Sequence, residues 1–448
     1  MKVLHYTLGM PPYRTGGLTK YSVDLIKTEK QQGMEVIVLY PGHYNFMNKT
    51  YIDFDKKYFG IKVYELVNPL PVSLLGGVGE PDKFIRRVNE KYIYNFLLRE
   101  KPDIVHIHTL MGLPFELVES AKALDIKTIF TTHDYYGLCP KVNLVNSENV
   151  LCENYCDGRE CVKCNLNSYS LPLITLMQSK IYRRLKNHNF VKHLRKRKNV
   201  QIQSAPLKQD YSSIDLHKSN KYVLLRQYYL NILDNIDFIH YNSTTAEQVY
   251  KKYLNKNNGK IINITHNDIK DNRKEKLFNR DYVNFGYVGP ISYNKGFFKL
   301  YEALEDLHKE GIDNWKLKVY GNKDNGPENP NITYYGSFDY NDLKEIYGDM
   351  DVLIIPSMWR ETFGFIVLEA LSHGVPCIVT DNVGSKDIIE KEKFGLITTP
   401  ENLSELLEKL IEDKNILADI RRNILSSDFP YTMDTHIREI KEMYINLL

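Results

Sequence analysis

The sequence lacks a long hydrophobic run, because no apolar stretch approaches the ~18 to 20 residues that cross a bilayer. Its first ten residues, MKVLHYTLGM, contain a histidine and lead into Pro11 and Pro12 without the small-residue cleavage site of a secretory signal. Lys and Arg together exceed Asp and Glu by only 59 − 56 = 3, which argues against a dedicated nucleic-acid-binding protein. We therefore expect a cytoplasmic protein whose partners do not include nucleic acid.

Cysteine is also scarce. Six cysteines in 448 residues are too few for a disulfide scaffold, yet five of them lie within Cys139–Cys164 with the spacing C-x12-C-x3-C-x4-C-x2-C. Four thiolates at such spacings can close a tetrahedral zinc site, with an iron–sulfur cluster as the rarer option and reduced free thiols as the alternative. We expect a structural metal held by Cys139, Cys152, Cys161 and Cys164. The sixth, Cys377, is expected to be an inert core thiol.

The chain is long enough for two or three domains at ~100 to 200 residues per domain. Its hydrophobic fraction of 43% and charged fraction of 26% are ordinary for a globular protein. Apolar patterning predicts strands at 2–8, 35–40, 104–108, 127–132, 283–288, 316–320, 332–335, 352–356 and 377–380, and helices at 18–32, 115–123, 296–310, 342–348 and 364–373. This alternation predicts an α/β fold of two Rossmann-like doubly wound domains.

Such sheets bind ligands at the carboxyl ends of their strands, so two facing domains would place a substrate in the cleft between them. We expect an N-terminal domain at 1–266 with an insertion at about 135–215. A polar stretch at 267–281 resembles an interdomain linker. The C-terminal domain is expected at 267–430, and the helix within 431–448 is expected to pack back on the N-terminal domain.

The insertion is strongly basic. No acidic residue occurs from Asn165 to Gln209, and basic residues between Lys180 and Lys198 alternate with apolar ones as in an amphipathic helix. One interpretation is a solvated helical face, and the other is contact with an anionic membrane surface or an anionic acceptor. With the apolar loop Leu66–Val78, the insertion suggests a membrane-proximal edge and peripheral association with the inner face of the cell membrane.

The most informative stretch is PSMWRETFGFIVLEALSHGVP at Pro356–Pro376, in which seven residues separate Glu361 from Glu369. If a helix begins near Phe363, the two carboxylates are on the order of 10 Å apart at ~1.5 Å rise per residue. That is at or beyond the ~5 to 9.5 Å of glycosidase carboxylate pairs, so they are not expected to flank one bond. They could contact opposite ends of one elongated ligand whose negative centre lies over the helix N-terminus.

Lys295 lies in GYVGPISYNKGF, where a buried strand ends and a helix begins. A lysine at such a turn can place its ammonium on a diphosphate, although most exposed lysines are simply solvated. The combination with Pro356–Pro376 favours the phosphate role. A dehydrogenase is not expected, because no G-x-G-x-x-G follows the first strand. Neither Lys295's loop nor Pro356–Pro376 contains a D-x-D carboxylate pair.

Several stretches together carry a family resemblance. They are the Gly16-Gly17 loop, PDIVHIHT at 102–109, THDYYGLCP at 132–140, GYVGPISYNKG at 286–296, the stretch 356–376, and the terminal helix from Thr435. The E-x7-E stretch is the specific part, whereas the Gly-Gly loop and HIH are not. Over nearly its whole length the chain resembles the retaining glycosyltransferases of family 4, which have the GT-B architecture of two Rossmann-like domains facing a central cleft.

The resemblance implies roles for individual residues. Glu369 would hold the ribose hydroxyls of a nucleoside diphosphate sugar, Glu361 would hydrogen-bond the donor sugar, and Lys295 would neutralise the diphosphate. The remaining implied contacts are backbone N–H groups of Thr362, Phe363 and Gly364 to sugar and phosphate, Gly336, Ser337 and Phe338 beside the nucleobase, His133 facing the donor sugar, and Gly16 and Gly17 approaching phosphate or acceptor. Glu361, His133 and Lys295 are thus expected to be the catalytic residues.

The sequence departs from the family at one position. The arginine that often follows the glycine at Gly289 is replaced here by Pro290, so one of two usual phosphate cations is missing. Arg360 is a candidate substitute. The resemblance implies transfer with retention by a front-face mechanism, in which the leaving phosphate takes the acceptor proton without a divalent metal. Charge that develops on the leaving diphosphate would be stabilised by Lys295 and the helix N-terminus.

The leading hypothesis is therefore a hexosyltransferase-type enzyme that moves sugar from a nucleotide diphosphate sugar to a glycan or lipid-linked acceptor in surface polysaccharide or glycoconjugate biosynthesis. The alternatives are a non-catalytic GT-B partner subunit and a nucleotide-sugar epimerase or phosphorylase on a similar fold. His106 and His108 lie on one face of a strand, which could suggest a metal pair. The family context favours packing or a peripheral cleft contact for both.

Overall fold

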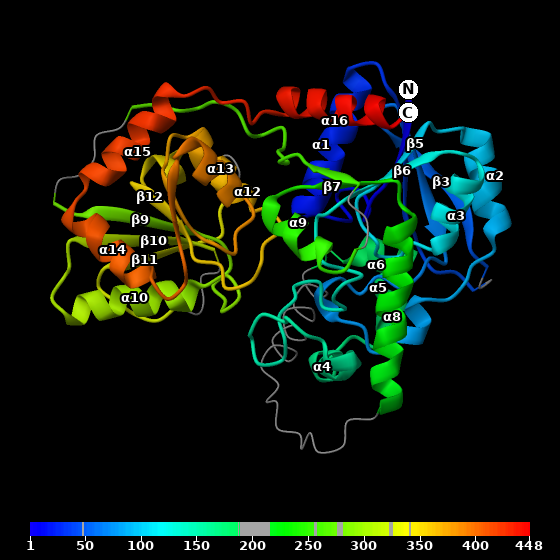
Figure 1. The fold of residues 1–448 in the computed structure, drawn as a ribbon, viewed down its shortest axis with the longest axis horizontal. Helices are drawn as coiled ribbons and strands as arrows, with labels where there is room; N and C mark the ends of the chain where they lie inside the picture. Colours follow the sequence, from blue (N-terminus) through cyan, green and yellow to red (C-terminus); the bar gives the residue numbers. More distant parts are fainter. Residues whose placement is uncertain are drawn as a thin grey trace. The chain divides into compact units, whose positions relative to one another are not determined.

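The structure is a computed structural model that describes residues 1–46, 49–186, 188, 216–254, 258–275, 281–321, 326–339 and 342–448. The chain forms two compact units (Figure 1). Unit 1 comprises Met1–Tyr241, Gln248–Ile262 and Ile437–Leu448, and unit 2 comprises Asn242–Glu247 and Asn263–His436. The break after Ile262 lies close to the boundary expected at 266. The basic residues 192–198 of the expected insertion lie outside the described residues.

Unit 1 is built on an eight-stranded sheet with the order β3-β4-β2-β1-β5-β6-β7-β8. The strands are β1 (Lys2–Tyr6), β2 (Glu35–Pro41), β3 (Tyr51–Tyr58), β4 (Ile61–Val67), β5 (Ile104–Ile107), β6 (Lys127–Thr131), β7 (Phe238–Tyr241) and β8 (Gly259–Ile261). All neighbours pair in parallel except β3 and β4. The β3–β4 hairpin was not expected from the sequence, and the charged side chains of β3 suit an exposed edge strand.

Helices cover this sheet and a long insertion follows β6. The helices are α1 (Gly17–Gln31), α2 (Glu90–Glu100), α3 (Phe115–Ala123), α4 (Arg159–Cys164), α5 (Leu171–Met177), α6 (Lys180–Leu185), α8 (Leu216–Asn235), α9 (Thr244–Lys251) and α16 (Met433–Leu447). Helix α1 buries Tyr21, Leu25 and Ile26 and ends before Gly33, whose φ of 83° is a left-handed conformation that glycine adopts at little cost.

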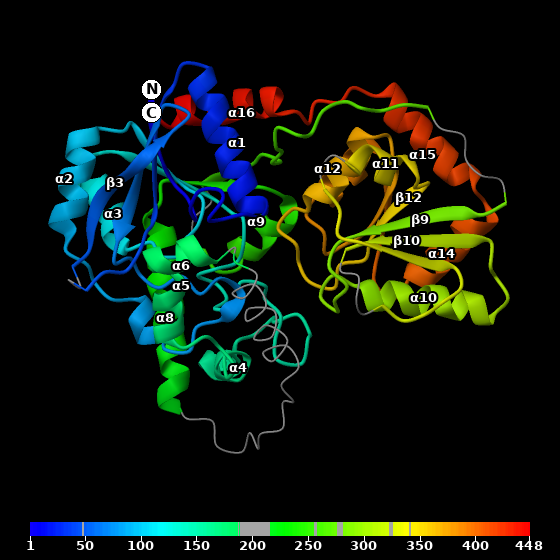
Figure 2. The ribbon, with the colours of Figure 1, turned by 180° about the vertical axis from the view of Figure 1, so that it is seen from behind.

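Unit 2 is a six-stranded, fully parallel sheet with the order β11-β10-β9-β12-β13-β14. Its strands are β9 (Val283–Val288), β10 (Trp315–Tyr320), β11 (Ile332–Gly336), β12 (Val352–Ile355), β13 (Cys377–Thr380) and β14 (Gly395–Thr398). Its helices are α10 (Phe297–Lys309), α11 (Leu343–Gly348), α12 (Phe365–Ser372), α13 (Lys386–Glu392), α14 (Leu403–Glu412) and α15 (Asn415–Ser426). Helices α10 and α14 lie on one face of the sheet and α11 and α12 on the other (Figure 2).

The apolar cores explain why these segments form strands and helices. In unit 2, Phe285, Trp315 and Leu317 on the strands are fully buried against Leu300 and Leu304 of α10. The described part of the polar stretch expected as a linker, 267–275, belongs to unit 2. There the N–H of Asn272 donates to the carbonyl of Ser372 at 2.8 Å. The predicted α/β fold of two doubly wound parallel domains is confirmed by these two sheets.

Candidate active site

The strand order of unit 2 places two distant loops side by side. Strands β9 and β12 are neighbours, and the chain passes from β9 to β10 on one side and from β12 to β13 on the other, which creates a topological switch point at the carboxyl ends of β9 and β12. Lys295 follows β9 and Glu361 follows β12. Lys295 Nζ lies 2.9 Å from Glu361 Oε1, although 66 positions separate the two residues along the chain (361 − 295). The order of the strands thus brings the expected cation and one of the expected carboxylates together.

Burial and an aromatic ring define this ion pair further. The Glu361 side chain is 9% exposed and that of Lys295 is 32% exposed, so solvent reaches the ammonium more easily than the carboxylate. Lys295 Nζ also lies 5.0 Å from the centroid of the Trp359 ring. A cation over an indole face is attracted by the ring quadrupole, which restricts the ammonium to one side of the carboxylate.

The loop after β13 fixes the backbone of Glu361. The Glu361 N–H donates to the carbonyl of Asn382 at 2.9 Å, and the Glu361 carbonyl accepts from the N–H of Gly384 at 3.1 Å. A Cβ at Gly384 would lie 2.2 Å from the carbonyl oxygen of Thr362, so only glycine allows this close approach. These contacts fix the backbone position from which the Glu361 carboxylate projects.

Helix α12 begins at Phe365, two residues later than expected, because Gly364 with φ 106° and ψ 80° leaves the helical region and forms the N-cap. No side chain caps this end, so backbone N–H groups of its first turn are open to a ligand. A helix that began near Phe363 would place Glu369 nearly two turns inside it; with the observed start at Phe365, Glu369 lies just over one turn inside.

Glu369 is 5% exposed and is held by two residues that the sequence did not indicate. The Tyr347 hydroxyl donates to Glu369 Oε2 at 3.1 Å, and His266 Nε2 lies 3.5 Å from Oε1. These residues are 22 and 103 positions away in sequence, so no local pattern links them to Glu369. Their contacts orient both carboxylate oxygens.

Aromatic rings gather at the carboxyl end of β10 and β11, where the nucleobase border was expected. Gly336 ends β11 with φ 81°, and Ser337 and Phe338 follow it. Tyr320 and Tyr335 stack with ring centroids 4.7 Å apart and an interplanar angle of 7°, and Phe338 meets Tyr320 edge-on at 6.2 Å. Tyr335 is 46% exposed, so a flat ring face is open to solvent.

The loop that carries Pro290 is pinned by a tyrosine. The Tyr287 hydroxyl donates to the carbonyl oxygen of Pro290 at 2.7 Å, and burial raises the pKa of Tyr287 well above its usual value, which keeps this donor protonated. Arg360, the candidate second cation, directly precedes Glu361 on the loop after β12. Trp359, which precedes it, is a further side chain of this loop that the sequence did not single out.

In unit 1, the expected glycine pair lies at the start of α1. Gly16 is the N-cap with φ 111°, no side chain caps the helix, and a Cβ built on Gly16 would meet nothing within 4 Å. Gly16 is therefore required for its backbone conformation, and the space in front of it is open. Gly17 is the first residue of α1.

His133 is one end of a buried hydrogen-bond chain that starts at Glu29. His133 Nε2 lies 3.3 Å from His108 Nδ1, His108 Nε2 lies 3.0 Å from His5 Nδ1, and His5 Nε2 lies 2.6 Å from Glu29 Oε2. Burial, and then the neighbouring histidines, lower the pKa of His108 well below its usual value. His108 is therefore a neutral ring that passes hydrogen bonds along the chain.

A second arm leaves the same carboxylate. The Tyr444 hydroxyl of α16 donates to Glu29 Oε1 at 3.0 Å and lies 2.6 Å from His106 Nδ1, and His106 Nε2 lies 2.7 Å from Thr131 Oγ1. Thr131 Oγ1 in turn lies 2.9 Å from Nδ1 of His240. His106 and His108 are fully buried, so they do not make a peripheral contact.

The ligating atoms of His5, His106 and His108 lie within 4.8 Å of one another, a spacing that a metal could use. Each ring nitrogen of these three residues already has a hydrogen-bond partner among the described residues. The arrangement therefore favours a hydrogen-bonded network. The sequence showed His106 and His108 as a pair, but the partners Glu29 and Tyr444 come from α1 and α16 and give no local signal.

The cysteines of the insertion lie around one pocket of unit 1, of about 290 Å³ including open solvent. Cys139, Cys152, Cys161 and Cys164 line it, whereas Cys156 does not and is exposed. None of the six cysteines forms a disulfide. Burial raises the pKa of Cys152 to about 11 and those of Cys161 and Cys164 to about 12, so as free thiols they would be poor nucleophiles. Cys377 is fully buried in β13.

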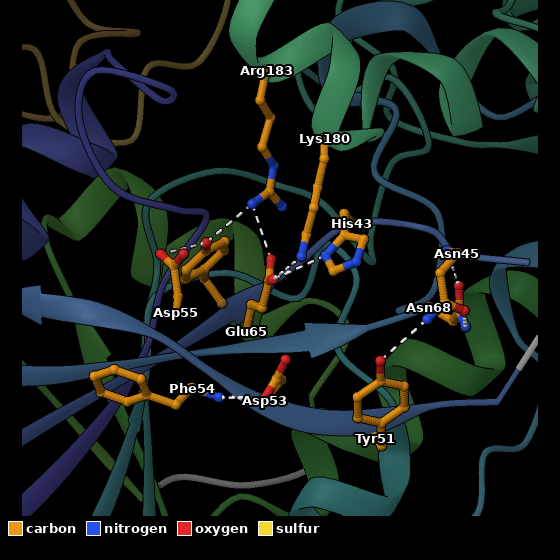
Figure 3. A network of polar contacts seen from close by, with 11 residues as sticks. His43, Asn45, Tyr51, Asp53, Phe54, Asp55, Glu65, Asn68, Lys180 and Arg183 are labelled. Carbon is orange, nitrogen blue, oxygen red and sulfur yellow. Dashed lines mark hydrogen bonds and ion pairs between the residues drawn. The ribbon is translucent and has the colours of Figure 1, made fainter. Parts of the chain in front are cut away.

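The described part of the basic insertion is tied to the sheet by a buried carboxylate. Glu65 of β4 is 3% exposed and lies 2.9 Å from Arg183 Nη1, 2.9 Å from His43 Nδ1 and 4.0 Å from Lys180 Nζ (Figure 3). Arg183 Nη1 also donates to the Tyr40 hydroxyl at 3.1 Å. Arg183 is therefore an internal anchor of α6 and not part of a solvated face.

The outer side of α5 and α6 remains apolar and basic. Leu176, Ile181 and Leu185 are 57%, 69% and 50% exposed, and Lys180 and Arg184 are exposed beside them. By contrast, the apolar loop Leu66–Val78 contributes little to a surface, because its large side chains are buried except for Leu74 and Leu75. Among the described residues, no helix is both long and apolar enough to span a membrane.

Comparison with known proteins gives two matching family profiles. "Glycosyltransferase Family 4" matches residues 15–151, within unit 1, and "Glycosyl transferases group 1" matches residues 268–426, within unit 2. The second match contains Lys295, Gly336, Glu361 and Glu369.

Individual relatives are distant. The capsular polysaccharide biosynthesis glycosyltransferase CapM of Staphylococcus aureus is 29% identical over 167 residues, which cover 34% of this chain and 43% of that protein. The match thus spans less than half the length of this relative. An uncharacterised 42.6 kDa protein from the cps region of Klebsiella pneumoniae is 22% identical over 389 residues, which cover 83% of each chain.

Solved structures share the fold. Anabaena HepE, crystallised with UDP and glucose, superposes over 100% of both chains with a TM-score of 0.57 at 14% sequence identity. WaaG, a glycosyltransferase involved in lipopolysaccharide biosynthesis, superposes over 99% of both chains with a TM-score of 0.53. With a family 4 profile on unit 1, a group 1 profile on unit 2 and this shared architecture, the chain belongs to the family 4 glycosyltransferases of GT-B fold.

Proposed function

We propose that the protein transfers a sugar, with retention of anomeric configuration, from a nucleotide diphosphate sugar to a glycan or lipid-linked acceptor. The observation that carries this proposal is the Lys295–Glu361 pair at the switch point of unit 2, beside the uncapped first turn of α12. A diphosphate needs a cation and backbone donors, and a glycosyl group needs an acceptor of hydrogen bonds, so this pair offers both kinds of contact within one loop system.

The charges of the pair match those that develop in the reaction. Departure of the nucleoside diphosphate breaks the bond between the anomeric carbon and the phosphate oxygen, which places negative charge on phosphate and positive charge on the sugar. Lys295 and the N-terminus of α12 would stabilise the first, and Glu361 would support the second. The acceptor oxygen would form the new bond to the anomeric carbon while the leaving phosphate oxygen takes its proton, so the step balances without a divalent metal.

Glu369 is proposed to hold the ribose. A carboxylate whose oxygens are already oriented by Tyr347 and His266 can accept hydrogen bonds from two neighbouring hydroxyls at once. The exposed face of Tyr335 and the adjacent Gly336–Phe338 segment would border the nucleobase. Thr362, Phe363 and Gly364 would donate backbone hydrogen bonds to sugar and phosphate.

Unit 1 is proposed to contribute the acceptor side. Gly16 and Gly17 would present the open N-terminus of α1, and the buried chain from Glu29 would hold the His133 ring in a fixed orientation. The apolar and basic outer side of α5 and α6 would rest on an anionic membrane surface, which would bring a lipid-linked acceptor to the enzyme. The names of CapM and WaaG support surface polysaccharide or lipopolysaccharide biosynthesis as the setting.

A donor screen tests the proposal. Thermal shift and donor hydrolysis would be measured with UDP-, GDP-, ADP- and dTDP-sugars, beginning with UDP-glucose because HepE is complexed with UDP and glucose. We expect one nucleotide class to stabilise the protein and to be hydrolysed slowly, and Glu369→Ala to lose the shift. If a nucleotide stabilises the protein but neither hydrolysis nor transfer is detected with any acceptor tested, the result would instead support a non-catalytic partner subunit.

Membrane association is tested separately by flotation with vesicles that contain an anionic phospholipid. We expect binding at low salt that is lost in the double variant Ile181→Ser, Leu185→Ser. Absence of wild-type binding at low salt would remove this part of the proposal and leave the donor site untouched.

A further inference from the structure

Four of the five clustered cysteines converge, and the fifth does not. Cys139 lies in the turn after β6, Cys152 follows the short β-bridge between Val145 and Leu151, and Cys161 and Cys164 lie on α4. All four line the same pocket, while Cys156 lies outside it. Three separate backbone segments therefore deliver a thiol to one place.

Packing and hydrogen bonds fix the backbone that carries these thiols. Cys161 and Cys164 are three positions apart on α4, so they share one face of the helix. A Cβ at Gly158 would lie 2.1 Å from the carbonyl oxygen of Ser219, so the start of α4 packs directly on α8. Asn165, which follows α4, donates to the carbonyl of Cys161 at 2.8 Å and accepts from the N–H of Val78 at 2.8 Å.

A buried cation in the same pocket points to an anionic occupant. Arg226 of α8 is 7% exposed and lines the pocket with its guanidinium 3.8 Å from the Tyr155 ring centroid. Its Nη1 atom has no hydrogen-bond partner among the described residues. The acidic residue of the pocket, Glu160, is already paired with Lys163 at 2.7 Å. A buried guanidinium with an unsatisfied N–H is costly unless an anionic group completes its contacts.

We propose that Cys139, Cys152, Cys161 and Cys164 bind one zinc ion that cross-links the 139–164 segment next to Arg226 of α8. Zinc favours four thiolates in tetrahedral geometry, and a Zn²⁺ with four thiolates carries a net charge of −2 that Arg226 and the pocket residue Lys141 would balance. The four sulfurs do not lie at ligand spacing: among the described residues, the group whose ligating atoms lie within 4.8 Å of one another is the histidine trio of unit 1. Binding would therefore require rotation of the cysteine side chains about χ1, which moves each sulfur between staggered positions.

The function of this zinc is structural. The segment 139–164 has little regular structure apart from α4, and its backbone turns through left-handed residues at Val142, Leu144, Asn149, Cys156 and Asp157. Such a segment gains little from helical or sheet hydrogen bonds, so a metal that joins its two ends would supply much of its order. The proposal is independent of the donor chemistry of unit 2.

Metal content of the full chain, purified in a reducing buffer without chelator, tests this directly. We expect about one zinc per chain by elemental analysis. The double variant Cys161→Ser, Cys164→Ser should lose it, whereas Cys156→Ser, a matched change in the same segment, should retain it. Zinc below a tenth of an equivalent that does not rebind to the reduced protein would overturn the proposal, as would equal loss in Cys156→Ser.

A second measurement uses the wild-type chain, so its result does not depend on whether the cysteine variants fold. Cobalt added to the reduced, chelator-stripped protein should give intense thiolate-to-cobalt absorption with visible bands of a tetrahedral site, and zinc should displace it. Cobalt bands without the thiolate transition would assign the metal to the histidines and refute the cysteine site. Iron together with acid-labile sulfide would show a cluster and refute zinc.

Discussion

Replacing Lys295 by Met should reduce catalysis far more than stability. The substitution keeps the length and apolar stem of the side chain and removes the ammonium that lies 2.9 Å from Glu361. If this ammonium stabilises the leaving diphosphate, its loss removes a preorganised charged donor from the place where negative charge develops. Comparable losses cost on the order of 10²–10³ in rate, or about 3 to 4 kcal/mol.

The effect on folding should be small. The Lys295 side chain is 32% exposed, so its ion pair with Glu361 is screened and contributes about 1 kcal/mol or less. That corresponds to about 2 to 4 °C in the melting temperature of a unit of this size. The double variant Lys295→Met, Glu361→Gln also removes the unpaired carboxylate, so it should recover the lost stability without recovering activity.

The assay is release of nucleoside diphosphate from the donor that the screen identifies, with kcat/KM compared at saturating acceptor or, without acceptor, for hydrolysis. Lys299→Met is the matched control, because this lysine on α10 has a similarly half-exposed side chain, at 38%, and its ion pair, at 3.9 Å, is with Glu302 and not with Glu361. We expect the control to match the wild type. A Lys295→Met enzyme within threefold of the wild type would refute the assignment of the diphosphate to Lys295.

Three further outcomes are expected. Glu369→Gln keeps the shape but loses the carboxylate charge, so nucleotide affinity measured by calorimetry should fall about tenfold, and an unchanged affinity would contradict the ribose role. Tyr444→Phe removes a hydroxyl shared by Glu29 and His106, so the free energy of unfolding in urea should fall by about 1 to 3 kcal/mol; a neutral result would mean that water replaces it. Burial lowers the pKa of His240 to about 4, so at acidic pH the unfolded state binds a proton that the folded state does not. The free energy of unfolding should therefore fall by about 3 kcal/mol as the pH drops from about 6.5 to 4. His240→Gln should flatten this pH dependence.

The sequence indicated most of the elements that position the site. The run that forms β12, VLII, is a continuous apolar segment, and β9 and β13 are mostly apolar; strands buried on both faces have that pattern, so these strands can be located from composition. Lys295 and Glu361 could be singled out because each lies on the loop that follows such a strand, β9 and β12 respectively. The start of α12 was harder to place, because only the backbone angles of Gly364 show that the helix begins after it.

The tertiary structure decided which of these residues meet. The order of strands in unit 2 puts the loops after β9 and β12 side by side, and no sequence spacing encodes that order. In the same way, Tyr347 and His266 at Glu369, and Glu29 and Tyr444 in the histidine network, come from segments that share a site only after folding. A local sequence pattern indicates which face of a segment is buried. The polar partners depend on which buried groups lie within hydrogen-bond distance of one another after the sheet has formed, and these groups come from distant parts of the chain.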